Sequence, residues 1–275
     1  MDPSTRVAVH GHRGARALLP ENTIAGFLCA IEAGVDFIEL DVAVTVDDVL
    51  VVSHDPVLNR RVRRRPRGSR IIRELTFEQV RLCDCGSRRN RRFRRQVPVP
   101  GARIPALDEV FALADRGPFQ FNVELKSFPL KPWLAPAPER LASLLLGAIE
   151  RHALAPRVLV QSFDIRVLRA MSRLAPHIRL SVLDELGARN FVSLARRAGT
   201  RIVGPYHRLV TERRVASAHK AGVQVVCWTA NQPRDWARLI RAGVDAIITD
   251  DPGGLITYLE AAGLRPPQTY PQTGS

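Results

Sequence analysis

The stretch Phe37-Ile38-Glu39-Leu40-Asp41-Val42 is an apolar run that carries two carboxylates two residues apart. Side chains at i and i+2 of a β-strand point to the same face, so Glu39 and Asp41 converge if this run is a strand. Two adjacent anions resist burial unless a cation or hydrogen-bond donors compensate them. Two interpretations follow: an edge strand with its acids in water, or a strand whose acidic face holds something positive.

A three-residue pattern that precedes this stretch, here called a glycine joint, recurs along the chain. Ala33-Gly34-Val35 leads into it, and the same three residue types at 221–223 and 242–244 each precede another apolar run, while Ala198-Gly199-Thr200 is a weaker copy. Each joint predicts a helix that ends at glycine and is followed by a buried strand. Repeated β-α units of this kind build parallel sheets, so we predict an α/β protein.

The apolar runs between these joints predict the whole architecture. Strands are expected to begin near residues 7, 37, 120, 158, 178, 202, 223 and 246, and helices to span about 24–33, 138–154, 165–174, 191–198, 212–221, 234–242 and 255–262. Eight β-α units in 275 residues are typical of a TIM (β/α)8 barrel, which is the fold we predict. A doubly wound open sheet is the alternative.

One further apolar run, residues 49–53, follows the opening stretch after only a few residues. A parallel neighbour would need a crossover of about a dozen residues, so this run must turn back as an antiparallel hairpin. The hairpin would return His54 and Asp55 to the C-terminal mouth of the barrel, where barrel enzymes place their chemistry.

The positive charge of the chain is concentrated in one segment. Residues 60–95 hold fifteen arginines against Glu74, Glu78 and Asp84, a balance of +12, so the rest of the chain carries only +2 of the net +14. The region of about 57–105 has little periodicity beyond a short helix near 76–82. We predict an insertion after the second strand that caps the C-terminal face of a single barrel domain of residues 1–262.

Three interpretations of this basic insertion are open: it draws anionic substrates to the mouth, makes weak contact with an anionic membrane, or is a solvated surface in an arginine-biased chain. Only three lysines occur beside the many arginines, which favours the last of them. Because one segment carries nearly all of the charge, no specific nucleic-acid partner is expected. The oligomeric state is left open.

Several global features bound the class of protein. No apolar run approaches the roughly 18 residues of a membrane span, and the N-terminus lacks a signal-peptide layout. Four cysteines without framework spacing suggest reduced thiols, and we expect a cytoplasmic protein. The Pro-rich residues 263–275 are expected to form a flexible tail.

Charged side chains follow several of the predicted strands at their C-terminal ends. They comprise three carboxylates, two histidines and two fixed cations, namely Glu39, Asp41, Glu124, His12, His54, Arg13 and Lys126. Three carboxylates are the hard oxygen ligands of Mg²⁺ or Ca²⁺, and the cations can neutralise phosphate oxygens. Histidines are suited to serve as acid and base at neutral pH. The set therefore predicts metal-assisted phosphoryl transfer at the barrel mouth.

Taken in order, the motifs of the chain resemble those of the glycerophosphodiester phosphodiesterases. The resemblance covers residues 7 to about 262, and its motifs are His12-Arg13-Gly14, Pro20-Glu21-Asn22-Thr23, Glu39-Leu40-Asp41, His54-Asp55, Glu124-Leu125-Lys126, Gln161-Ser162-Phe163, Trp228-Thr229-x-Asn231 and Asp245-x-Ile247-Ile248-Thr249-Asp250. Each motif alone is weak, but the ordered set is specific.

The resemblance implies a TIM barrel that hydrolyses a small-molecule glycerophosphodiester to sn-glycerol 3-phosphate and an alcohol, either directly with water or through a cyclic phosphate. It implies one divalent cation, Mg²⁺ or Ca²⁺ with Mn²⁺ as a further candidate. Its implied residue roles are metal ligation by Glu39, Asp41 and Glu124, acid and base catalysis by His12 and His54 in an unassigned order, phosphate contact by Arg13 and Lys126, and an apolar wall at Trp228.

Two alternative functions and two departures from the family pattern accompany this interpretation. The alternatives are lysophospholipase D-type activity on lysophospholipids and a non-catalytic basic barrel that binds phosphate or nucleic acid. A phosphate cradle at 251–254 ranks lower, because no metal ligand or base accompanies it. The hairpin turn reads Asp47-Asp48 where the family has Asp-Gly, and Ala106 stands where the family has a threonine helix cap, a loss of about 1 kcal/mol.

Overall fold

The computed structural model describes residues 6–59, 62, 68–187 and 190–266, and its centre is a closed barrel of parallel strands. Neighbouring barrel strands pair in chain order, and β1 pairs with both β2 and β9, which closes the ring. The predicted TIM barrel is confirmed, and the open doubly wound sheet is wrong. The barrel strands are β1 (Ala8–His12), β2 (Phe37–Val44), β4 (Gln120–Leu125), β5 (Val158–Ser162), β6 (Arg179–Asp184), β7 (Ile202–Pro205), β8 (Gln224–Cys227) and β9 (Ala246–Thr249).

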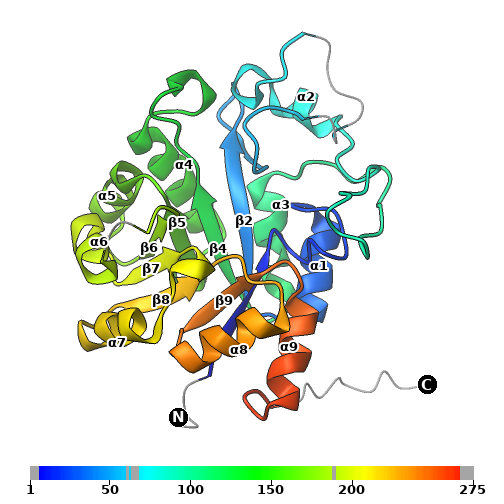
Figure 1. Ribbon diagram of the computed structural model, residues 1–275. Coiled ribbons are helices and arrows are strands. Elements are labelled where there is room, and N and C mark those ends of the chain that lie inside the picture. The colour runs from blue at the N-terminus through cyan, green and yellow to red at the C-terminus, as the bar shows by residue number, and fades with distance from the viewer. Residues whose placement is uncertain (1–5, 60–61, 63–67, 188–189, 267–275) are drawn as a thin grey trace.

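Helices surround the barrel on its outside, as Figure 1 shows. Two of the predicted glycine joints end helices as expected. Gly199 caps α6 (Phe191–Ala198) and Gly243 caps α8 (Pro233–Ala242), both in the left-handed conformation, which glycine adopts without steric cost. The helices are α1 (Ile24–Glu32), α2 (Phe77–Arg81), α3 (Leu107–Phe111), α4 (Pro138–Arg151), α5 (Ile165–Leu174), α6 (Phe191–Ala198), α7 (Glu212–Lys220), α8 (Pro233–Ala242) and α9 (Pro252–Ala261).

Both faces of β2 are buried. Its outward side chains Ile38, Leu40 and Val42 pack in the large core between barrel and helices. Its inward Phe37 belongs to a separate apolar cluster inside the barrel. Because side chains alternate along a strand, Glu39 and Asp41 must point into the barrel interior, where both are buried. The solvent-facing edge strand is therefore wrong.

The predicted hairpin is confirmed: β3 (Leu50–Val52) pairs antiparallel with β2. Its turn places Asp48 at φ 59°, a left-handed conformation that aspartate tolerates less well than glycine. Ion pairs hold the turn in place, because Asp48 accepts from Arg73 at 3.0 Å and from Arg140 at 2.7 Å.

After β3 the chain runs over the barrel end toward which β2 points (Figure 1). This segment has a small apolar core of its own, formed by Val51, Leu58, Val62, Ile72, Leu75, Val80, Cys83 and Ile104. At its end, Ala106 occupies the N-cap of α3 and offers no capping side chain, as expected. The Glu109 carboxylate accepts from the Ala106 N–H at 2.8 Å, which supplies half of a capping box.

Helix α4 ends at Arg151, three residues before the predicted end at residue 154. The cause is Ala153, which adopts φ 52°, and the N–H groups of Ala153 and Leu154 close the helix onto the carbonyls of Glu150 and Ile149. Alanine is strained in this left-handed conformation. The residue type at position 153 therefore does not indicate that the helix ends there.

Ala153→Gly is therefore expected to raise the free energy of unfolding by about 1 kcal/mol, because glycine adopts positive φ without the strain. Urea unfolding followed by circular dichroism measures the change. The matched control is Ala216→Gly in the exposed middle of α7, which is expected to lose about 1 kcal/mol. A loss of stability in both variants would contradict the assignment of strain at Ala153.

Within the described ranges, no helix has the length and apolarity needed to cross a membrane.

Candidate functional site

Three carboxylates meet inside the mouth of the barrel. Glu39 and Asp41 extend from β2 and Glu124 from β4, and the strand register sets Asp41 opposite Glu124. One oxygen of each lies within 4.8 Å of those of the other two, and all three residues are buried. A group of oxygen donors alone suits Mg²⁺ or Ca²⁺ better than it suits zinc.

Two fixed cations lie among these carboxylates. Arg13 Nε is 3.1 Å from Asp41 Oδ2, and the Arg13 backbone N–H donates to Glu39 Oε2 at 3.0 Å. Lys126 Nζ lies 3.0 Å from Asp41 Oδ1 and 2.6 Å from Glu124 Oε1. Two cations against three carboxylates leave one negative charge without compensation at the centre of the site.

The pKa values of the acids reflect this imbalance. Burial, reinforced by Asp41 and Glu124, raises the pKa of Glu39 well above its usual range. Burial also opposes ionisation of Asp41, but Lys126 and Arg13 outweigh it and hold the pKa of Asp41 well below normal. The surplus negative charge and the three carboxylate oxygen donors fit a divalent cation.

Amide side chains hold two of the three carboxylates in place. Gln161 on β5 donates to Glu39 Oε1 at 2.9 Å, and Asn22 before α1 donates to Asp41 Oδ2 at 3.0 Å. Asn122 on β4 in turn donates to Gln161 Oε1 at 3.0 Å. Such partners fix the orientation of ligands around a metal. Asn22 and Gln161 belong to motifs of the family resemblance, but no contact of the three amides with the carboxylates was predicted from the sequence.

His12 is held by a carboxylate at the end of β9. Its Nδ1 lies 2.6 Å from Asp250 Oδ1, while Asn231 donates to Asp250 Oδ2 at 2.7 Å. A carboxylate accepts only, so Nδ1 carries the proton and Nε2 keeps its lone pair. Burial lowers the pKa of His12, although Asp250 opposes this effect. The ring is therefore neutral near pH 7 and able to take up a proton at Nε2.

His54 lies at the end of the hairpin, closer to solvent. Its side chain is 37% exposed, against 12% for His12. Its Nδ1 is 2.8 Å from Asp55 Oδ1, and this hydrogen bond is the main cause that lowers the pKa of Asp55 to about 2. Asn59 also donates to Asp55, at 2.7 Å. The two histidines are thus oriented by separate carboxylates.

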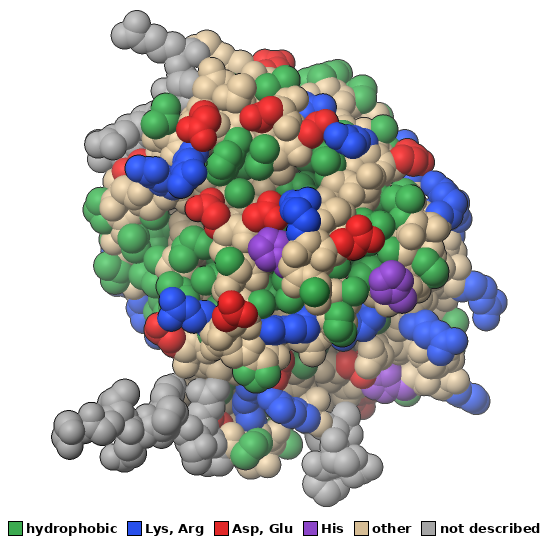
Figure 2. Space-filling view, turned by 180° about the vertical axis from the view of Figure 1, so that it is seen from behind, with side chains coloured by type: hydrophobic (Ala, Val, Ile, Leu, Met, Phe, Trp, Pro, Cys, Tyr) green, Lys and Arg blue, Asp and Glu red, His purple; other side chains and the backbone are tan. Residues whose placement is uncertain are grey.

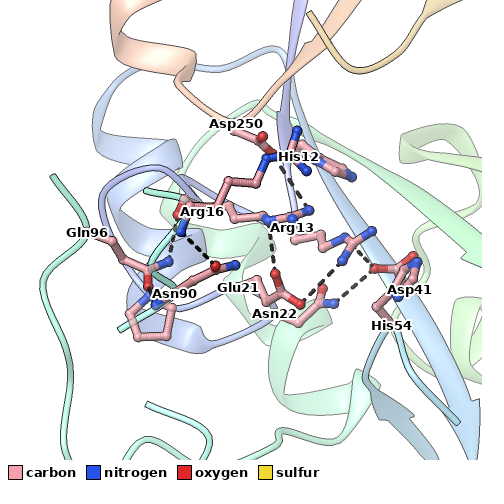
Figure 3. Close-up of polar contacts among 12 residues, drawn as sticks. His12, Arg13, Arg16, Glu21, Asn22, Asp41, His54, Asn90, Gln96 and Asp250 are labelled. Carbon is pink, nitrogen blue, oxygen red and sulfur yellow. Dashed lines mark hydrogen bonds and ion pairs between the residues drawn. The ribbon is translucent and has the colours of Figure 1, made fainter. Parts of the chain in front are cut away.

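A second layer of ion pairs surrounds Arg13. Glu21 lies between Arg13 and Arg16 (Figure 3), and its carboxylate oxygens are 3.3 Å from Arg13 Nη1 and 2.9 Å from Arg16 Nε. Figure 3 also shows Arg13 and Asn22 directed at Asp41. Neither Arg16 nor the bridging role of Glu21 was anticipated from the sequence.

The site opens into a cavity of about 1190 Å³ at the barrel mouth. All of the sequence-predicted residues come together here: Asp41 lies buried in contact with Arg13 and Lys126, and the cavity lining includes His12, Arg13, Glu39, His54, Glu124, Lys126 and Trp228. Trp228 is fixed by its Nε1–H, which donates to the Gly204 carbonyl at 2.7 Å, and it meets Phe163 edge-to-face at 5.6 Å. One wall of the cavity is therefore aromatic.

The buried pair of Asp250 and His12 predicts a pH dependence of stability. Burial opposes ionisation of Asp250, but His12, Arg16 and Asn231 together lower its pKa to about 2 from 3.8. A depressed carboxyl pKa contributes stability above pH 3.8 that is lost as pH falls toward 2. The full contribution is about 2 kcal/mol, and about 1 kcal/mol of it is lost by pH 3.

Asp250→Asn is expected to remove this contribution. The difference in free energy of unfolding between parent and variant should therefore be about 2 kcal/mol at pH 6 and about 1 kcal/mol at pH 3. Urea titrations at the two pH values measure it. Asp235→Asn, which removes a carboxylate from the lining of the same cavity, serves as the control. A constant gap between Asp250→Asn and the parent at both pH values would contradict the assignment.

Comparisons with known proteins converge on one family. The model of the glycerophosphoryl diester phosphodiesterase family matches residues 12–254. A glycerophosphodiester phosphodiesterase of Caldanaerobacter subterraneus is 35% identical over 94% of this chain and all of its own length. A Silicibacter pomeroyi protein that carries the same family name has a crystal structure with a TM-score of 0.88 at 33% identity, covering 94% of this chain and 95% of its own.

An Oleispira antarctica phosphodiesterase, solved with its product sn-glycerol-3-phosphate, has a TM-score of 0.79 at 22% identity. It covers 94% of this chain and 98% of its own. At 22% identity, this similarity shows that the two proteins share a fold.

Proposed function

Because the chain belongs to the glycerophosphoryl diester phosphodiesterase family and is a phosphoric diester hydrolase, we propose that it hydrolyses glycerophosphodiesters to sn-glycerol 3-phosphate and an alcohol. We further propose that one divalent cation, Mg²⁺, Ca²⁺ or Mn²⁺, takes part. The observation that carries the proposal is the convergence of three carboxylates, two cations and two histidines on one cavity.

Each side chain of the site has a role in this proposal. Glu39, Asp41 and Glu124 would hold the cation, whose bound charge would neutralise phosphate oxygens. Arg13 and Lys126 also face the phosphate and stabilise charge that develops on its oxygens. Both cations stay charged throughout, because buried carboxylates surround them.

The two histidines divide the proton transfers. Neutral His12, with Nδ1–H bound to Asp250, takes the proton of the attacking hydroxyl at Nε2. His54, nearer to solvent, gives a proton to the oxygen of the departing alcohol. The attacking hydroxyl belongs either to water or to C2 of the glycerol, and in the second case a cyclic phosphate precedes hydrolysis by water.

The test is a hydrolysis assay of glycerophosphocholine and glycerophosphoethanolamine with Mg²⁺, Ca²⁺ or Mn²⁺ added, and with EDTA. Release of sn-glycerol 3-phosphate with at least one cation, and its loss in EDTA, is the expected result. Full activity in EDTA would overturn the cation, and no hydrolysis under any condition would overturn the function.

The aromatic wall favours a second candidate, lysophospholipase D-type activity. Phe163 lines the cavity and remains 48% exposed, and Trp228, Tyr206 and Leu183 lie on the same lining. An acyl chain on the glycerol would find apolar surface there. Choline release from lysophosphatidylcholine, compared with release from glycerophosphocholine, separates the two activities.

Two observations disfavour a non-catalytic barrel that binds phosphate or nucleic acid. The chain belongs to a family of enzymes, and on the face seen in Figure 2 the described basic side chains are mixed with acidic and hydrophobic ones.

We propose that residues of about 57–105 cap the mouth of one barrel domain of residues 1–262. Four free thiols support a cytoplasmic location. Membrane contact stays a prediction, and the tail at 267–275 lies outside the described residues.

A further inference from the structure

The returning part of the arginine-rich insertion, residues 90–97, is fixed against the barrel mouth. Gln96 is buried and donates from Nε2 to the carbonyls of Arg16 at 2.8 Å and Leu19 at 3.1 Å. The Val97 N–H donates to the Leu18 carbonyl at 2.8 Å. Figure 3 shows Gln96 and Asn90 beside Arg16. The Gln96 side chain and the Val97 backbone thus hold this segment against the loop that follows β1.

An aromatic contact adds to this docking. Phe93 is buried, and the Arg16 guanidinium lies over its ring at 5.0 Å. The fixed backbone around Phe93 carries Arg92, Arg94 and Arg95 into the lining of the cavity. We call this lining of Arg16, Arg92, Arg94 and Arg95 the arginine wall. It belongs to the same cavity as the carboxylates and histidines of the site.

Charges on the arginine wall are only partly compensated. Arg16 is paired with Glu21 at 2.9 Å, and Arg95 is paired with Asp251. Arg92 and Arg94 form no ion pair with any residue in the described part of the chain. Elsewhere on the lining, Arg208 and Arg234 are matched in number by Glu185 and Asp235. The surplus positive charge of the cavity lining therefore lies at Arg92 and Arg94.

We propose that the arginine wall binds an anionic group, a phosphate monoester or a carboxylate, on the alcohol arm of the substrate. The inference rests on the proposed function and narrows its substrate class. The scissile phosphate is proposed to lie at Arg13 and Lys126, and the glycerol arm has no charge of its own, so a second anion for Arg92 and Arg94 can come only from the alcohol arm. A cationic alcohol such as choline meets like charges there, and the site discriminates against it.

General electrostatic attraction is the competing explanation. A positive rim speeds the approach of every anionic diester, whatever its alcohol. Removing rim charge would then lower kcat/KM for all diesters by the same factor. Direct binding of an anionic alcohol instead changes the ratio of kcat/KM between substrates, which makes this ratio the decisive quantity.

The experiment compares two matched diesters, glycerophosphoglycerol and the same compound with a phosphate monoester on its second glycerol, together with glycerophosphocholine. For the unaltered protein, kcat/KM is expected to be about tenfold higher with the phosphorylated diester than with its unphosphorylated match. Glycerophosphocholine is expected to be the poorest of the three. The preference should shrink at high salt, because rim charges are exposed.

The double variant R92Q/R94Q is expected to reduce the ratio between the matched diesters about tenfold. R92K/R94K keeps the charge and should retain most of the preference, which separates lost binding from lost folding. The control R70Q/R81Q removes the same charge from exposed positions of the insertion outside the cavity lining and should leave the ratio unchanged.

Each outcome bears on one proposal. A ratio that R92Q/R94Q leaves unchanged, or an equal loss with all three diesters, would overturn the arginine wall as an alcohol-arm site while leaving the phosphodiesterase intact. Hydrolysis of none of the three diesters with any cation would instead overturn the proposed function.

Discussion

Glu39→Gln is expected to lower cation-dependent turnover by about a thousandfold or more, because a neutral amide replaces one of the three carboxylates that would hold the cation. The substitution keeps the size of the side chain, but its single amide oxygen can accept from only one of the two donors, the Arg13 N–H and Gln161 Nε2, that reach the two carboxylate oxygens. The loss would therefore report the missing charge together with one lost hydrogen bond. The same loss is expected for Asp41→Asn, whose carboxylate is the other proposed cation ligand on β2.

The two substitutions are expected to differ in their effect on stability. Burial and the neighbouring carboxylates raise the pKa of Glu39, so its charged form is disfavoured in the cation-free protein. Glu39→Gln should then be neutral or stabilising in EDTA. Asp41 compensates Arg13 and Lys126, so Asp41→Asn leaves two buried cations short of a partner. That variant should lose about 3 kcal/mol of unfolding free energy.

Isothermal titration with Mn²⁺ and thermal unfolding in EDTA measure cation affinity and stability separately. Glu185→Gln is the matched control, because it removes a carboxylate from the same cavity outside the triad. Near-normal turnover in Glu39→Gln would show that the cation is not held there. Unfolding of Glu39→Gln in EDTA well below the parent would show that the acid stabilises the fold.

The local features of the fold were predictable because they depend on neighbours in sequence. The glycine joint before Phe37 marks the end of one helix and the start of the next strand within a few residues. The hairpin followed from the short spacing between β2 and β3. Alternation along β2 placed Glu39 and Asp41 on one face. In each case the determining contacts lie close together along the chain.

The partners of the site residues were not predictable in the same way. Asp250 is 238 residues from His12, and Gln161 is 122 residues from Glu39. The first pair meets because β9 returns beside β1, and the second because β4 pairs with both β2 and β5. A sequence signal existed nonetheless: Asp250 and Gln161 belong to motifs of the family resemblance and lie at C-terminal ends of barrel strands, although no role in the site was predicted for either. The left-handed Asn22 and Ala153 carry no such signal.

Substitution of either histidine by alanine is expected to lower turnover of glycerophosphodiesters by about a hundredfold to ten-thousandfold, with cation affinity retained. Neither His12 nor His54 belongs to the carboxylate triad, so titration with Mn²⁺ should give the parental affinity. The matched control is exposed His177→Ala, which should keep parental turnover.

The two variants are expected to differ in their dependence on the departing alcohol. A p-nitrophenyl diester releases a stable phenolate that needs no proton, so loss of the general acid should cost little with this substrate. If His54 is the acid, His54→Ala should recover to within about tenfold of the parent, whereas His12→Ala should remain inactive because the base is still missing. Recovery of His12→Ala instead would reverse the two roles.

The pH profile provides an independent check of the same assignment. Burial lowers the pKa of His12, so the acidic limb of kcat/KM should lie below pH 6.5, the ordinary value for histidine. Because Asp250 favours the protonated ring, Asp250→Asn should move this limb to lower pH still. A limb that stays in place in Asp250→Asn would show that a group other than His12 accepts the proton. The base would then have to be sought among residues that Asp250 does not contact.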